Sequence, residues 1–149
     1  MKLMLLYTLA FMGGVFLAVQ AGFNTQLSTF LKQPVLAVIS TSVASAFFGS
    51  ILIIFIGKSS LPLSALREIP IHLWFIGGLF SMAGISLYFY TIPQLGIARM
   101  ITLGLFGQII FSLIAGKFGW LNLPVEPITF RRIAGVAAML LGILLINTK

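Results

Sequence analysis

The sequence predicts an all-α membrane protein, a bundle of five transmembrane helices. Of its 149 residues, 60% are hydrophobic and only 7% are charged, and the mean hydropathy is +1.16. So few polar side chains cannot cover a soluble globule of this size. The apolar residues also fall into five runs, and a run of about 20 helical residues crosses about 30 Å of hydrocarbon. We therefore expect residues 1–149 to form a single five-helix transmembrane domain.

The first run covers residues 3–21 and follows Lys2. Its length favours a retained span over the shorter apolar region of a signal peptide. Residues 22–32 carry polar side chains but no helix breaker after Gly22, which leaves open a continuation of the first helix beyond the membrane face. We therefore expect the first run to be a transmembrane span.

The other spans are bounded by Pro and Gly, which end helices. We place them at residues 35–56, 71–90, 97–116 and 133–146, with breakers at Pro34, at 57–62 and Pro70, at Pro93 and Gly96, and from Gly119 to Pro127. An odd number of spans puts the two termini on opposite sides of the membrane.

The basic residues predict the orientation. Six would lie on the N-terminal side (Lys2, Lys58, Arg67, Lys117, Arg131 and Arg132) and three on the other (Lys32, Arg99 and Lys149). Positive residues favour the cytoplasmic side, so we expect a cytoplasmic N-terminus. The formal net charge of +7 lies between the apolar runs and not on a folded polar face, which suits lipid headgroups and argues against nucleic-acid binding.

Small residues recur on single faces of three spans, where they allow close approach of helix backbones. They are Ser42, Ser45, Ala46 and Gly49 in the second span, Gly77, Ser81 and Gly84 in the third, and Gly135, Ala138 and Gly142 in the fifth. Helix packing is the favoured interpretation over ligand binding.

Polar side chains within the first and fourth spans are the strongest candidates for a binding site. Gln20 and Asn24 are four residues apart, so both amides project from one side of the first helix. An unpartnered amide in hydrocarbon is costly, so both should face protein or an aqueous cavity. Solute contact, hydrogen bonding between helices and, for Asn24, a place at the headgroup level all stay open. The fourth span has a similar stripe, Gly104, Gln108, Ser112 and Gly116.

Three further side chains lie near span ends. Arg99 is about one turn into the fourth span, where snorkelling to the interface is favoured over anion binding. Tyr88 is an expected interfacial residue, and His72 is interfacial in preference to a proton relay. The predicted substrate-binding residues are thus Gln20, Asn24, Gln108, Ser112, Tyr88 and Arg99.

The chain has no Cys and one His, and its only carboxylates, Glu68 and Glu126, lie outside the spans. A cation exporter built around an intramembrane carboxylate is therefore disfavoured. Neither a metal site nor an acid/base pair can be assembled from these residues, so we expect no cofactor and no enzymatic activity.

Seven short motifs, taken in order and spacing, resemble the YdcZ-type small inner-membrane exporters of the drug/metabolite transporter superfamily. They are QAGFNTQL (20–27), Pro34 with AVIS (37–40), WFIGG (74–78), IPQLG (92–96), GQIIFSL (107–113), FGW (118–120) and RRIAG (131–135). The resemblance covers the whole sequence. It implies half of a ten-helix transporter, in which two inverted five-helix halves enclose a cavity that opens to each side in turn. Many relatives have an acidic residue where Gly116 and Lys117 stand here.

The leading hypothesis is a secondary transporter, an exporter of a small organic solute by alternating access, with Gln20, Asn24 and Gln108 lining the cavity. It would act as a homodimer or with a paralogous partner. The six-to-three charge bias argues against equal populations of both orientations, which leaves open an oppositely oriented paralogue or a non-inverted dimer. One alternative is an accessory or assembly subunit of another membrane protein. Another is a lipid-phosphate translocase in which Arg99 and the Arg131-Arg132 pair hold the phosphate.

Overall fold

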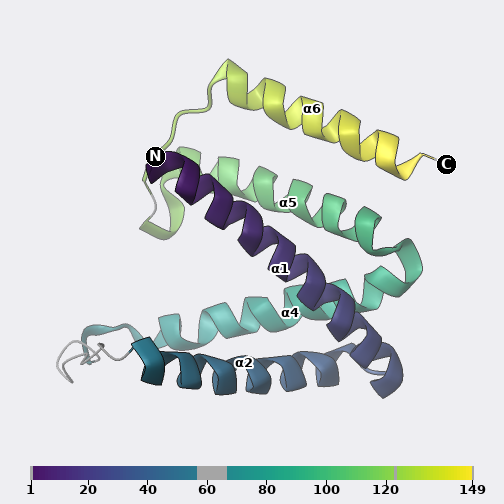
Figure 1. The fold of residues 1–149 in the computed structure, drawn as a ribbon. Helices are drawn as coiled ribbons and strands as arrows, with labels where there is room; N and C mark the ends of the chain where they lie inside the picture. The colour runs from purple at the N-terminus through teal and green to yellow at the C-terminus, as the bar shows by residue number, and fades with distance from the viewer. Residues whose placement is uncertain (1, 57–66, 123, 149) are drawn as a thin grey trace. The chain divides into compact units, whose positions relative to one another are not determined.

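The computed structural model describes residues 2–56, 67–122 and 124–148. The predictions that concern the connection at 57–62, Lys58 and Lys149 lie outside these residues. The described residues form five long helices (Figure 1): α1 (Lys2–Leu31), α2 (Pro34–Ile56), α4 (Ile71–Leu95), α5 (Ile97–Phe118) and α6 (Phe130–Asn147). A short 3-10 turn, η1 (Trp120–Asn122), follows α5.

The predicted fold class is confirmed. All five helices are long and apolar enough to cross a membrane, and the described part of the chain contains no strand. Large apolar side chains such as Phe16, Phe55 and Phe80 are exposed along them. Such surfaces are expected where the surroundings are lipid tails.

Helix α1 runs well past the predicted end of its span at residue 21 and ends at Leu31. Its polar residues are compatible with the helix because their hydroxyls bond within it: Thr25 donates to the Ala21 carbonyl at 2.7 Å and Thr29 to that of Gln26 at 2.7 Å. The helix ends where Lys32 adopts a left-handed φ of 54°. Pro34 then begins α2, which suits the first turn of a helix.

The same back-bonding occurs elsewhere in α1 and in α2, α4 and α5. Hydroxyls donate to carbonyls three or four residues earlier in the same helix at Thr8, Thr41, Ser50, Thr91, Thr102 and Ser112. These side chains therefore satisfy their polar groups without a partner from another helix.

Helix α4 also exceeds its predicted span. Pro93 does not end the helix, which continues to Leu95. A proline this close to the C-terminus removes only one backbone hydrogen bond. The chain breaks instead at Gly96, whose φ of 85° and ψ of 153° form a conformation that is essentially restricted to glycine.

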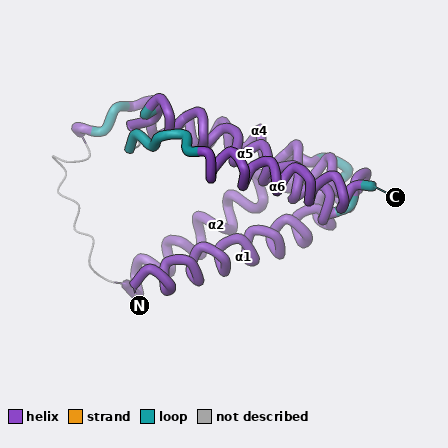
Figure 2. The backbone as a smooth tube through the Cα atoms, turned by 90° about the horizontal axis from the view of Figure 1, so that it is seen from above, coloured by secondary structure: helices purple, strands orange, loops and turns teal. Residues whose placement is uncertain are grey.

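The chain divides into two compact units, Met1–Pro93 and Gln94–Lys149. In the first unit, α1 and α2 are joined by a tight turn, and both views show them meeting there (Figures 1 and 2). Around that end a small core forms from Ala37, Val38 and Phe89, packed against Leu27, Ile85 and Tyr88. The core thus ties α1, α2 and the second half of α4 together.

In the second unit, α5 and α6 form an antiparallel hairpin. Gly119 ends α5 with a left-handed φ of 62°, and its amide donates to the carbonyls of Ala115 and Gly116. Thr129 caps α6 by accepting a hydrogen bond from the Arg132 amide. Between them the loop is held against α5, because the Glu126 amide donates to the Gly116 carbonyl at 2.9 Å. These three contacts set the start of α6 beside the end of α5.

Candidate functional site

A groove of about 770 Å³ runs between α1 and α2 and is open on one side. Gln20 and Asn24 lie one helical turn apart on its α1 wall, and Thr41 and Ser45 lie on its α2 wall. Both amide side chains are half-buried. The remaining lining residues are apolar or small: Gly13, Phe16, Leu17, Phe23, Ala44 and Phe48.

The α1–α2 groove offers hydrogen bonds but no charge. Each amide supplies a carbonyl acceptor and two N–H donors, which can be directed at different groups of one ligand. The Thr41 hydroxyl donates to the Ala37 carbonyl at 2.8 Å, so its oxygen remains able to accept. Three phenylalanines, Phe16, Phe23 and Phe48, line the same groove. The groove therefore suits a small organic molecule with an uncharged polar group.

A second groove, of about 400 Å³, lies between α5 and α6. Ser112 is on its wall, and its hydroxyl donates to the Ile109 carbonyl at 2.9 Å. Its other lining residues are Leu113, Gly116, Glu126, Arg132, Gly135, Val136 and Met139. This α5–α6 groove is thus mostly apolar, with both charged side chains at the end near the loop.

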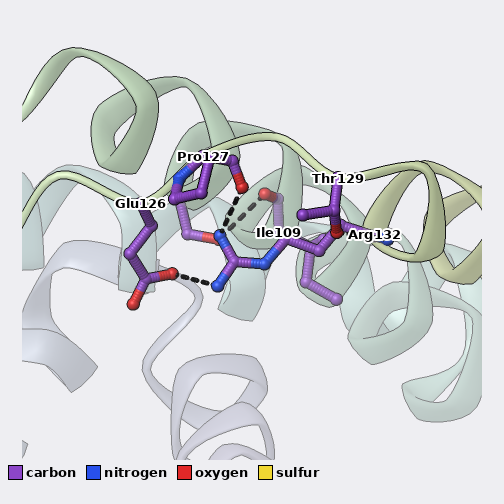
Figure 3. Close-up of polar contacts among 6 residues, drawn as sticks. Ile109, Glu126, Pro127, Thr129 and Arg132 are labelled. Atoms are coloured by element: carbon purple, nitrogen blue, oxygen red, sulfur yellow. Dashed lines mark hydrogen bonds and ion pairs between the residues drawn. The ribbon is translucent and has the colours of Figure 1, made fainter.

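Glu126 and Arg132 form an ion pair at that end (Figure 3). The Arg132 Nη2 atom lies 2.5 Å from Glu126 Oε2, and Nη1 donates to the Pro127 carbonyl at 3.1 Å. The side chains are 39% and 57% exposed, respectively. Ion pairs with this exposure in water contribute about 0–1 kcal/mol. The pair fixes the position of the two charges more than it stabilises the fold.

Sequence reasoning missed this pair. It treats Glu126 as a loop carboxylate and Arg132 as one of three possible phosphate ligands, with Arg99 and Arg131. The two residues are separated by a loop, so helical periodicity gives no sign of their contact. The available signal was local: a threonine helix cap at residue 129, which places the third residue of α6 back over the preceding loop.

The other predicted residues are dispersed. Gln108 is on an exposed part of α5 and does not line the α5–α6 groove, although Ser112 and Gly116 of the same stripe do. Tyr88 packs against the small core of the first unit. Arg99 is half-buried in the first turn of α5, and its carbonyl accepts from the Thr102 hydroxyl at 2.9 Å. Gln20, Asn24 and Tyr88 thus belong to the first unit, and Arg99, Gln108 and Ser112 to the second.

His72 is exposed in the first turn of α4. Among the described residues there is no group of three or more His, Cys, Asp or Glu side chains close enough to hold a metal ion. In the described residues, the polar groups that line the two grooves are amides, hydroxyls and the Glu126–Arg132 ion pair.

Comparison with protein families gives one match, which agrees with this picture. The profile of the family described as "Putative inner membrane exporter, YdcZ" matches residues 5–145. The match includes all of the lining residues of both grooves. No curated protein and no solved structure matches the chain.

Proposed function

The chain belongs to the YdcZ family of inner-membrane exporters, and we propose that it exports a small organic solute whose polar group binds in the α1–α2 groove. Family membership and the five apolar helices make it a multi-pass inner-membrane protein. The single observation that supports the solute site is that Gln20 and Asn24, both half-buried, line the same groove.

The energetics favour a ligand role for the amides. Thr25 and Thr41 satisfy their hydroxyls on their own helix backbone. An amide has more donors and acceptors than such a contact can use. In a membrane, unused polar groups are costly unless water or a ligand reaches them. A solute that replaces water in the groove would complete these hydrogen bonds.

Two parts of the transport hypothesis remain predictions from the sequence. One is that Gln108 takes part in the same cavity. The other is that the chain acts as a homodimer or with a paralogous partner. A single groove between two helices encloses little volume, which supports a partner for full enclosure. An accessory role without transport would leave the groove amides without functional effect.

The lipid-phosphate translocase is less well supported. Arg99 is in the first turn of α5, whereas Arg132 shares a groove with Gly116 at the other end of that helix. Seventeen residues of helix at 1.5 Å each separate these ends by about 25 Å. The two arginines therefore cannot hold one phosphate together.

The test is export from proteoliposomes loaded with a small-molecule extract of bacterial cells, followed by mass spectrometry of the retained solutes. We expect the wild-type protein to deplete at least one solute relative to empty liposomes. Gln20→Leu and Asn24→Leu should each fold normally and lose this depletion, because each removes hydrogen bonds to the solute.

Gln26→Leu is the matched control. Gln26 is an amide on the same helix that is exposed and does not line the groove, so its loss should leave export unchanged. If the wild-type protein depletes nothing, the export proposal fails. If it exports but the two groove variants do so at the wild-type rate, the amides belong to helix packing and the assigned site is wrong.

A further inference from the structure

The α5–α6 groove has a charged mouth and an apolar floor. We propose that it holds a phospholipid with a zwitterionic, primary-amine headgroup, with the phosphate on Arg132, the ammonium on Glu126 and part of one acyl chain along the floor. This inference does not depend on the identity of an exported solute, because it concerns a different groove in a different unit.

The floor extends inward from the charged mouth along both helices. On α5, Gly116 is near the mouth and Ile109 is seven residues earlier, which is about 10 Å along the axis. On α6, Met139 is likewise seven residues beyond Arg132. Between them lie the apolar side chains of Leu113 and Val136, and Ser112, whose hydroxyl is bonded to the Ile109 carbonyl of its own helix. A chain lying along this floor would therefore meet hydrocarbon on both sides.

The groove is open where the acyl chain would lie. Gly135 lines it, and no atom approaches within 4 Å of the position that a Cβ atom would take there. The opposite wall at Gly116 is closed only by the loop, where the Cβ atom of Glu126 would lie 3.8 Å from such a Cβ atom. The Glu126 residue thus lies against α5 at the mouth, its carboxylate stays exposed, and the floor beside Gly135 is open.

Aromatic and basic residues beside the mouth mark the depth of lipid headgroups. Phe118 and Trp120 stack with their ring centroids 5.8 Å apart at the end of α5. The Lys117 Nζ atom lies 5.4 Å from the centroid of the Phe118 ring. Aromatic rings and lysines of this kind gather at the membrane–water interface. The Glu126–Arg132 pair is in the same part of the hairpin.

The two charges complement a zwitterionic headgroup. A guanidinium group has five N–H donors, and Arg132 uses two in its contacts with Glu126 and Pro127. The remaining donors can reach a phosphate oxygen. Glu126 is more than half exposed and can accept from an ammonium group. A choline headgroup has no N–H to donate, and a glycerol headgroup has no cation for the carboxylate.

The experiment is native mass spectrometry of the purified full chain in detergent, after equilibration with equal parts of phosphatidylethanolamine, phosphatidylglycerol and phosphatidylcholine. We expect the wild-type protein to retain phosphatidylethanolamine in preference to the other two. Glu126→Gln should reduce the preference over phosphatidylcholine about tenfold, the effect of one charge-assisted hydrogen bond. Arg132→Gln should reduce retention of phosphatidylethanolamine by a similar factor.

Arg131→Gln is the matched control, because Arg131 is the neighbouring exposed arginine and does not line the groove. Gly135→Leu tests the floor without altering the ion pair, and it should displace the lipid. The proposal is overturned if the wild-type protein binds phosphatidylglycerol or phosphatidylcholine equally well. It is also overturned if Gly135→Leu retains phosphatidylethanolamine as the wild-type protein does, since the ion pair would then serve only to hold the loop.

Discussion

Replacement of Gly96 by alanine tests the backbone conformation that separates α4 from α5. Gly96 has a φ of 85° and a ψ of 153°. A non-glycine residue in this region costs about 1–3 kcal/mol. Alanine also lowers the conformational entropy of the unfolded chain, which offsets about 0.4–1 kcal/mol of this cost. The net expectation is a loss of about 0.5–2 kcal/mol in the free energy of unfolding.

Steric crowding does not enter this estimate, because no atom is within 4 Å of the position of an added Cβ atom at Gly96. The assay is unfolding in mixed micelles by titration with SDS, followed by tryptophan fluorescence. Gly107→Ala is the matched control: Gly107 is within α5, has a similarly open Cβ position and has no positive φ. It should be neutral or slightly stabilising, since alanine favours helix. Equal stability of the two variants would refute the conformational argument.

Three other outcomes are expected. Single cysteines introduced at Leu3 and Thr148 should be labelled from opposite sides of intact cells, because five spans separate them; labelling of either one from both sides would indicate dual orientation. Thr129→Ala removes the cap of α6 and should lower the free energy of unfolding by about 1 kcal/mol, whereas an unchanged SDS midpoint would mean that the cap contributes nothing. Phe89 is 2% exposed against Ala37 and Val38, so Phe89→Ala should destabilise the protein. The loss should fall below the 3–5 kcal/mol typical of soluble cores, because lipid accepts the exposed apolar surface; a loss above that range would contradict this reasoning.

The existence and order of the five helices could be predicted from the sequence, because hydrocarbon thickness imposes a length on every apolar run. Their ends were less predictable. Proline predicts a helix break at Pro93, but a proline this near a helix end removes only one backbone hydrogen bond. The residue at which α4 stops is Gly96. The length of α1 depends on hydroxyl groups that bond to its own backbone, which a hydropathy profile does not register.

The candidate site, too, could be predicted from the sequence only in part. The four-residue spacing of Gln20 and Asn24 was sufficient to put them on one side of a helix, and the structure places both in one groove. The stripe on α5 was less informative, because Ser112 lines a groove and Gln108 does not. The Glu126–Arg132 pair depends on how a loop folds back onto a helix, and the sequence contains no periodic signal for that contact.

The intrahelical hydroxyl bonds have a consequence for biogenesis. Each helix that carries them enters the bilayer with these donors already occupied, so insertion does not have to wait for a neighbour to arrive. When the inserted helices later pack against one another, protein contacts replace lipid contacts and those hydrogen bonds stay intact. Such a sequence is compatible with integration of the segments one after another by the translocon. A pause between any two segments would leave none of these hydroxyls without a hydrogen bond in the hydrocarbon.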